Sequence, residues 1–285
     1  MKCASNPLRH GRGSVTEPRA SASGLCIVLL LGATALLPAE TNLQRGKRVV
    51  DEALAALGGS KFLAMEDRIE DGRAYSFYRE RLTGLAKAKI YTRYLRSSGG
   101  ENELAQRERQ TFGKDEDYLV LFTGNRGYQI TYRGAQPLPE DRWRRYYQST
   151  RHNILYIFRT RLNEPGMIFE SRGADVWQNT PVEIVDITDA DNNVITVYFQ
   201  ISTKLPLRET YSIRDPKTKE KTDYSIVFAK YRDAGDGVQW PYNIRSERNG
   251  EKNFEMYSDS VTINQGLTDE MFTLSSDLKV LPARP

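Results

Sequence analysis

Histidine and cysteine side chains most often carry acid–base, nucleophilic or metal chemistry, and this chain has very few of them. Its two histidines are His10 and His152, and its two cysteines are Cys3 and Cys26. His152 follows Arg151 on the polar side of an expected helix, so we predict that it is a solvated surface residue. A Ser-His-Asp or Cys-His arrangement, or a metal site built from histidines, is therefore not expected.

Two acidic clusters are the remaining candidates for chemistry. Residues 189–193 (DADNN) begin like a calcium loop, but Val194 and Gln200 stand where such a loop needs a glycine and an acid, so we predict a hairpin turn. Residues 115–117 (DED) lie beside an expected strand, where a solvated turn is favoured over an acid–base pair. Nucleophile-elbow, phosphate-loop and dinucleotide motifs do not occur. The sequence predicts a non-enzyme with no catalytic residue, no metal and no cofactor.

A short apolar run near the start indicates export. Residues 25–37 (LCIVLLLGATALL) contain no charge, and they follow a basic lead with Lys2, Arg9, Arg12 and Arg19. As a helix this run would be about 20 Å long, shorter than a hydrocarbon core of about 30 Å. We therefore predict a secretory signal over residues 1–39, cleaved near Ala39, and a periplasmic protein. An uncleaved anchor or a buried helix is the alternative.

Removal of residues 1–39 would change the charge of the chain. Lys and Arg fall from 41 to 37 and Asp and Glu from 37 to 36, so the formal net charge falls from +4 to +1. Nucleic-acid binding then has little electrostatic driving force. The remaining residues 40–285 contain no obvious linker, and we predict a single domain and a monomer.

Short segments of alternating apolar and polar residues predict an antiparallel sheet. They recur at intervals of about ten residues and are separated by turn sequences, which is typical of a meander. The expected strands are residues 87–94, 118–122, 128–132, 182–187, 194–201, 205–213, 224–231, 238–246 and 253–263.

Two segments have helical periodicity. Residues 43–57 place apolar side chains on one face and end at Gly58-Gly59. Residues 140–163 contain no glycine or proline and predict one amphipathic helix about 36 Å long, which could cover a curved sheet as a lid.

The last fifth of the chain has a more specific pattern. Its residues are Gly237-x-x-Trp240-Pro241, Asn249-Gly250, Asn264, Leu267-Thr268-Asp269 and Phe272. With the leader, the first helix and the string of strands, this pattern resembles the LolA/LolB-type lipoprotein carriers. The resemblance implies an α+β fold, a curved antiparallel half-barrel of about eleven strands covered by helices. It also implies an apolar cavity for acyl chains and a role in outer membrane lipoprotein sorting, with a membrane-bound donor or acceptor protein as a further partner.

Aromatic side chains of the expected strands and of the 140–163 helix are the candidate lining of such a cavity, because they cover broad apolar surfaces. The candidate ligand-binding residues are Tyr75, Phe77, Tyr91, Phe122, Trp143, Tyr147, Ile154, Phe158, Tyr198, Tyr211, Phe228, Trp240, Phe254 and Met256.

Three functions stay open from the sequence. The first is a carrier of a lipid or of an acylated lipoprotein. The second is an interaction or stress-sensing protein on the same fold, similar to RseB. The third and least favoured is a hydrolase that uses carboxylates, which would need two acids close together in a concave pocket, one of them with a raised pKa.

Overall fold

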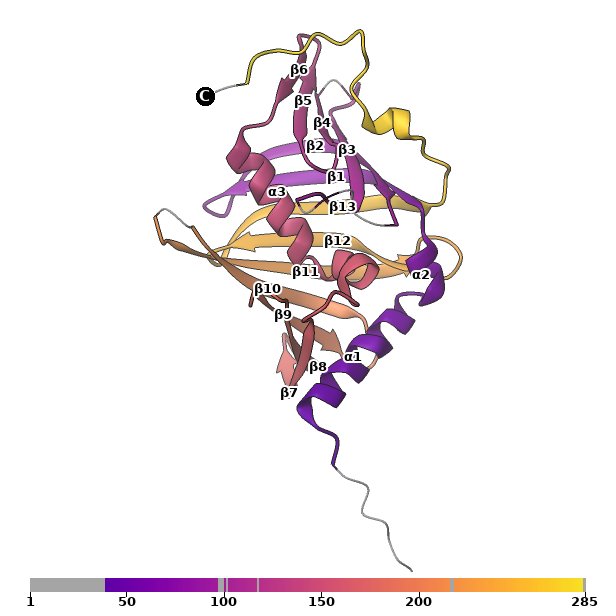
Figure 1. The fold of residues 1–285 in the computed structure, drawn as a ribbon, viewed down its shortest axis with the longest axis vertical. Coiled ribbons are helices and arrows are strands. Elements are labelled where there is room, and N and C mark those ends of the chain that lie inside the picture. Colours follow the sequence, from indigo (N-terminus) through magenta and orange to yellow (C-terminus); the bar gives the residue numbers. More distant parts are fainter. Residues whose placement is uncertain (1–38, 97–99, 101, 117, 216–217, 284–285) are drawn as a thin grey trace, which may run out of the picture. The chain divides into compact units, whose positions relative to one another are not determined.

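The computed structural model describes residues 39–96, 100, 102–116, 118–215 and 218–283. The predicted leader lies outside these residues except for Ala39. Residues Glu40–Pro285 form one compact unit (Figure 1). Among the helices described, none is both long enough and apolar enough to span a membrane.

The described strands form one open, curved antiparallel sheet, as predicted, but with thirteen strands rather than about eleven. Their order is β6-β5-β4-β3-β2-β1-β13-β12-β11-β10-β9-β8-β7. The strands are β1 (Asp67–Tyr78), β2 (Arg81–Tyr94), β3 (Gln106–Phe112), β4 (Tyr118–Phe122), β5 (Gly127–Thr131), β6 (Gly134–Pro137), β7 (Ile168–Trp177), β8 (Thr180–Thr188), β9 (Val194–Gln200), β10 (Pro206–Arg214), β11 (Lys221–Asp233), β12 (Gln239–Arg248) and β13 (Glu251–Ile263).

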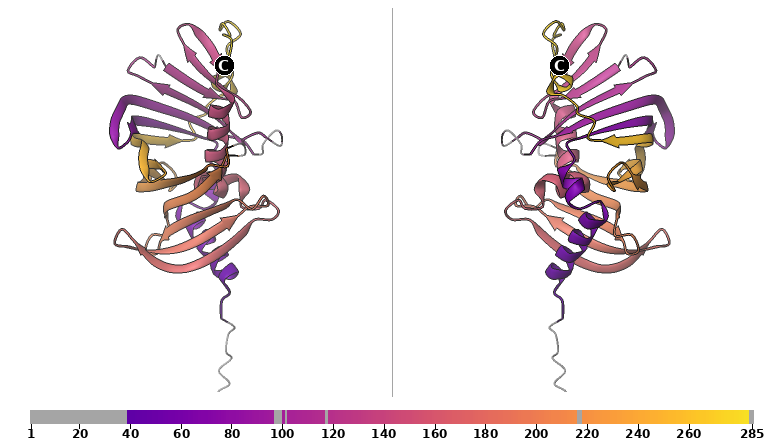
Figure 2. Two further views of the ribbon diagram at one scale, coloured as in Figure 1. Left: turned by 90° about the vertical axis from the view of Figure 1, so that its left-hand side faces the viewer. Right: turned by 90° about the vertical axis from the view of Figure 1, so that its right-hand side faces the viewer.

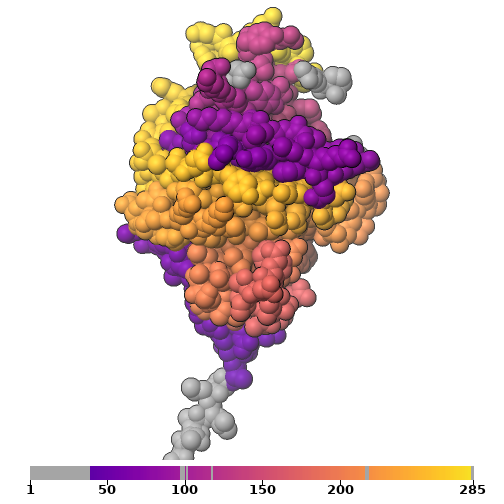
Figure 3. Space-filling model, turned by 180° about the vertical axis from the view of Figure 1, so that it is seen from behind, coloured from indigo at the N-terminus to yellow at the C-terminus, as the bar shows by residue number. Residues whose placement is uncertain are grey.

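The order of the strands explains where the helices lie. Consecutive strands are neighbours except at one connection, because β6 and β7 form the two opposite edges of the sheet. The chain between them runs through α3 (Glu140–His152), α4 (Ile154–Tyr156) and the π-helical turn η1 (Ile157–Arg161). Figures 1 and 2 show this connection crossing the concave face. The sheet therefore has one face covered by helices and one face, seen in Figure 3, without a helical layer over its central strands.

The first helices cover the other end of the concave face. Helix α1 (Asn42–Ala56) confirms the prediction for residues 43–57, and α2 (Ser60–Ala64) follows it. Gly46 lets α1 lie directly on β7, because a Cβ atom at this position would be 2.5 Å from the Phe169 carbonyl oxygen. Val49, Val50 and Ala53 of α1 are buried in the main apolar core.

The prediction of a single helix over residues 140–163 is wrong. The helix ends at His152, and Asn153 is extended (φ −68°, ψ 125°). Two side chains replace the lost helical bonds: Glu209 Oε2 accepts a hydrogen bond from the Ile154 N–H at 2.7 Å, and Asn153 Oδ1 accepts one from the Leu155 N–H at 2.9 Å. The break turns Ile154 and Phe158 into the core beneath α3.

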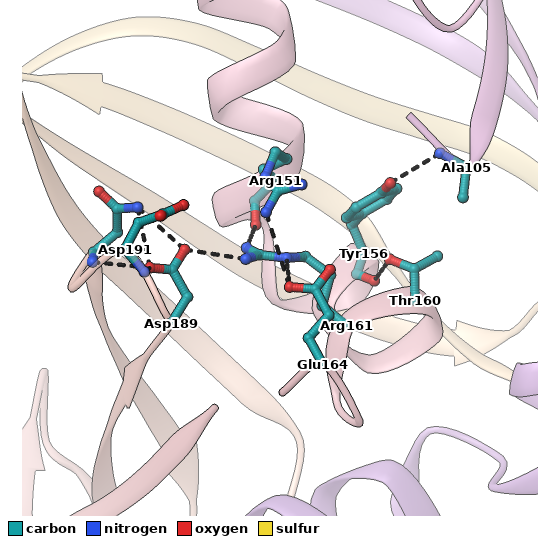
Figure 4. Close-up of polar contacts among 9 residues, drawn as sticks. Ala105, Arg151, Tyr156, Thr160, Arg161, Glu164, Asp189 and Asp191 are labelled. Carbon is teal, nitrogen blue, oxygen red and sulfur yellow. Dashed lines mark hydrogen bonds and ion pairs between the residues drawn. The ribbon is translucent and has the colours of Figure 1, made fainter. Parts of the chain in front are cut away.

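A buried arginine fixes the end of this connection (Figure 4). Arg161 is 2% exposed, its Nη2 lies 3.0 Å from Asp189 Oδ2, and its Nε lies 2.9 Å from Glu164 Oε2. Its Nη1 also donates to the Arg151 carbonyl at 2.7 Å. Asp189 begins the hairpin turn predicted at residues 189–193, so that prediction is confirmed. The Asp189 carboxylate, which stands at the first position of the calcium-loop pattern, forms an ion pair with Arg161.

The C-terminal motif is held by one carboxylate. Asp67 accepts hydrogen bonds from the backbone N–H groups of Gln265, Gly266 and Leu267 at 2.7–2.9 Å. The turn η2 (Asp269–Phe272) follows, and it buries Phe272 to 2% exposure in an apolar cluster on the outer face of β4 and β5.

We expect Asp67→Ala to lower the free energy of unfolding by about 3 kcal/mol, because three backbone N–H groups lose a buried charged acceptor. Urea unfolding followed by circular dichroism measures this change. The matched control is Asp259→Ala, which removes an exposed ion pair with Arg73 and should cost about 0.5 kcal/mol or less. Equal stability of the two variants would contradict the role of Asp67.

Candidate functional site

A cavity of about 460 Å³ lies between α3 and the concave face of the sheet. Its volume is within the range of small-molecule sites. Its wall comes from α3 and α4, from strands β1–β3 and from strands β10–β13. The lining residues are Arg68, Tyr94, Gln106, Glu108, Gln110, Arg145, Tyr146, Ser149, Thr150, Asn153, Leu155, Tyr156, Tyr211, Ile213, Tyr224, Ile226, Trp240, Ile244, Ser246, Glu247, Asn253 and Phe254.

One side of the cavity is apolar. Strands β10, β11 and β12 contribute it, because every second residue of a strand points to the same face. Tyr211 and Ile213 come from β10, Tyr224 and Ile226 from β11, and Ile244 from β12. The rings of Tyr211 and Tyr224 stack with their centroids 5.1 Å apart. The result is a continuous hydrocarbon and aromatic surface.

The opposite side is polar. Gln106, Glu108 and Gln110 follow one another on the inner face of β3. Glu108 is 9% exposed, and burial raises the pKa of its carboxyl above the usual value. Gln110 Nε2 donates a hydrogen bond to Glu108 Oε1 at 2.6 Å. This side can therefore offer hydrogen bonds to a ligand.

A buried cation connects the two sides. Arg68 is 8% exposed and lies over the Trp240 ring, 4.0 Å from its centroid. Burial alone would lower the pKa of Arg68, but nearby groups, led by Glu70 at 3.0 Å, raise it overall. Glu70 Oε1 also accepts the Trp240 Nε1–H at 2.7 Å, and Arg68 Nη1 donates to the Tyr94 hydroxyl at 2.8 Å. The arginine thus stays charged and fixes the indole in the wall.

Helix α3 closes the cavity with a polar stripe. Tyr146, Ser149, Thr150 and Asn153 line the cavity at the i, i+3, i+4, i+7 spacing of one helical face. Tyr146 also stacks on Phe122 of β4, with centroids 3.5 Å apart. This contact anchors the N-terminal half of the lid helix to the far part of the sheet.

The structure brings only part of the predicted site together. Three of the fourteen residues line the cavity, namely Tyr211, Trp240 and Phe254. Others lie on the concave side but pack into core clusters instead: Ile154, Phe158, Phe228, Phe122 and Met256 are buried there, and Trp143 is half-buried against Phe122. Tyr147 lies on α3 with its ring below Arg151.

Four predicted residues lie on the other face of the sheet, so we leave them out of the proposed site. Tyr75 and Phe77 are on the β1–β2 hairpin, and Tyr75 packs edge-on against Tyr257. Tyr91 packs in the outer-face cluster with Phe272, and Tyr198 lies against Trp177. Periodicity predicts alternation along each strand, but it does not say which alternate set faces inward.

The prediction for His152 is wrong. It is 9% exposed and stacks on Tyr211, with ring centroids 4.6 Å apart, and burial lowers its pKa. Because the helix ends at this residue, its side chain turns toward the sheet. Its Nδ1 lies 2.6 Å from the Gln148 carbonyl oxygen.

Sequence reasoning missed the polar side of the cavity. The signal was present, since Arg68 and Glu70 are two apart on β1, and Gln106, Glu108 and Gln110 are two apart on β3. Charged or amide residues at every second position of a strand mark a polar face, and here that face is the inner one.

The acids around the cavity bear on the hydrolase alternative. Glu108 and Glu247 both line it. Burial raises the pKa of Glu108, and Glu247 is paired with Arg245 at 3.0 Å. Glu70 accepts a hydrogen bond from Trp240, forms an ion pair with Arg68 and does not line the cavity. Within the described residues, no cluster of three or more His, Cys, Asp or Glu side chains could hold a metal ion.

No protein-family model and no curated protein matches the sequence, but solved structures match the fold. A candidate outer membrane lipoprotein-sorting protein domain from Vibrio parahaemolyticus aligns with a TM-score of 0.53 and 12% identity, over 81% of this chain and 97% of that one. A DUF1329 family protein from Desulfovibrio piger aligns with a TM-score of 0.53 and 13% identity, over 80% and 97%. A LolA superfamily protein from Nitrosomonas europaea aligns with a TM-score of 0.49 and 11% identity, over 80% and 97%. The protein has the LolA-like fold. Identities this low establish the LolA-like fold alone.

The carboxyl at the lid break generates a prediction about pH. Glu209 is 0% exposed, its Oε1 has no partner among the described residues, and burial raises its pKa to about 8. The folded state therefore keeps a proton that the unfolded state releases above its normal pKa of 4.5. Stability from this group is fully present below pH 4.5 and is lost as pH rises toward 8, by up to about 1.4 kcal/mol per pH unit.

We expect Glu209→Gln to remove this slope, so that unfolding free energy between pH 5 and pH 8 becomes flatter than in the wild type. Urea unfolding at each pH measures it. Glu251→Gln, at an exposed position at the start of β13, is the control and should keep the wild-type slope. A Glu209→Gln profile identical to that of the control would show that Glu209 does not hold this proton.

Proposed function

We propose that the protein is an exported carrier that holds acyl chains of a lipid or of an acylated lipoprotein in the cavity beneath α3. The observation that supports this most directly is the continuous apolar wall of β10–β12 under a helical lid. In this proposal residues 1–39 are a cleaved leader, and residues 40–285 are the working domain of a periplasmic protein. It acts without catalysis and without a cofactor.

Hydrophobic burial is large enough to hold such a ligand. A chain of 14–16 carbons releases about 0.8 kcal/mol per buried methylene, or roughly 10 kcal/mol before the costs of association. The wall is already formed by packed side chains such as Tyr211 and Tyr224, so little ordering is needed on binding.

The polar wall indicates that the ligand is an amphiphile. Gln106, Gln110 and the raised-pKa carboxyl of Glu108 would hydrogen-bond to ester, amide or hydroxyl groups next to the acyl chain. Arg145, which lines the cavity and is also half exposed to solvent, would face an anionic head group. A pure hydrocarbon would not use the hydrogen-bonding capacity that these groups keep beyond their contacts within the protein.

The fold agrees with this proposal. The Vibrio parahaemolyticus domain with the same architecture is a candidate lipoprotein-sorting protein, and an acyl chain is the part of a lipoprotein that water excludes. A carrier also needs a donor and an acceptor, and we propose that membrane-bound proteins fill these roles.

We expect Ile213→Trp together with Ile226→Trp to weaken binding of a fluorescent fatty acid at least about tenfold, because two indoles would occupy the space of the chain. Fluorescence titration and displacement by unlabelled phospholipid measure it. Val176→Trp, at a 64% exposed position on β7, is the matched control and should bind like the wild type. Unchanged binding in the double variant would contradict the cavity as the binding site.

A further inference from the structure

The end of the β1–β2 hairpin projects beyond its neighbouring strand. Strand β2 pairs with β3 only from Ala88 onward, where Ala88 lies opposite Phe112. Residues 81–86 of β2 therefore have no strand on that side. Figures 1 and 2 show this hairpin, coloured purple, extending past the edge of the neighbouring strands, and Figure 3 shows it reaching the margin of the outer face.

This end exposes large apolar side chains. Tyr78, Leu82 and Leu85 are 65%, 54% and 58% exposed. Leu82 lies opposite Phe77 and Leu85 lies opposite Tyr75. Residues directly opposite in an antiparallel pair share a face, so Tyr75, Phe77, Leu82 and Leu85 form one apolar patch on the outer face of the hairpin. Tyr78, which lies opposite Arg81, is on the other face of the same hairpin end. An exposed patch of this kind usually marks a contact surface.

Cations surround the patch. Arg79 is in the turn and Arg81 follows it, and among the described residues neither forms an ion pair. Arg79 lies 5.3 Å from the centroid of the Tyr78 ring, and Lys252 Nζ lies 4.4 Å from that of Phe77. The single acid of the turn, Glu80, accepts a hydrogen bond from the Lys252 backbone N–H at 2.9 Å. Lys252 Nζ is paired with Glu255 Oε2 at 3.1 Å, so the positive surplus of the hairpin end comes from Arg79 and Arg81.

The turn itself is unusual. Arg79 and Glu80 have φ of 49° and 61°, in the left-handed region where two-residue hairpin turns normally use asparagine and glycine. A non-glycine residue in this region costs free energy.

We propose that the end of the β1–β2 hairpin inserts its apolar patch into the surface of an anionic lipid bilayer. Leucine and aromatic side chains would enter the boundary between head groups and acyl chains, while the arginines contact lipid phosphates. This docking surface is separate from the cavity and does not depend on the cavity holding a ligand.

Co-sedimentation with vesicles tests the proposal, using residues 40–285, the compact unit that contains the whole described core. The vesicles are phosphatidylcholine alone or with about 30% phosphatidylglycerol. We expect the wild type to bind the anionic vesicles and to be released by salt. Leu82→Ser with Leu85→Ser should weaken binding about tenfold. Arg79→Gln with Arg81→Gln should remove the preference for anionic vesicles.

Two controls separate docking from other effects. Val176→Ser with Val194→Ser removes apolar side chains that are exposed elsewhere, and this variant should bind vesicles like the wild type. The Ile213→Trp, Ile226→Trp variant should also bind vesicles, because its filled cavity leaves the hairpin intact. Circular dichroism checks the fold of every variant. Absent wild-type binding, or equal binding by the leucine variant and the Val176, Val194 control, would overturn the proposal.

Discussion

Because β6 and β7 are the two edges of one open sheet, the chain between them has to cross the full width of that sheet. This connection supplies the helical layer that a curved sheet needs on its apolar face, and it also forms the roof of the cavity. The side chains of Glu209 and Asn153 accept backbone hydrogen bonds just after His152, where helix α3 ends. Arg161 fixes the end of the connection to the turn at Asp189. The cavity is the space left where the straight helix α3 spans the curved strands.

Much of the fold could be predicted from the sequence, because strands such as 194–201 and 224–231 alternate clearly and their turns carry the expected residues. The helix break could not be predicted, since the acceptor for Ile154 N–H is Glu209, 55 residues away. The error at His152 has the same origin. A local pattern predicts an element, but a partner from another part of the chain can end it.

The candidate site was only partly predictable. Tyr211 and Trp240 line the cavity as expected for aromatic residues of inner strands. The buried position of Arg68 could not be predicted from β1 alone. Its charge is tolerated only between the Glu70 carboxylate of β1 and the Trp240 ring of β12. Removing one member of such a group would leave a buried charge unpaired. The wall is therefore a stable part of the fold as well as a surface that a ligand can meet.

The central claim is that the cavity holds an acyl chain. Native mass spectrometry of residues 40–285, purified from the exported fraction without detergent, tests it most directly. The carrier proposal predicts a discrete added mass that organic extraction resolves into phospholipid or acylated peptide. A protein that has no added mass, and gains none after incubation with lipids, would contradict it.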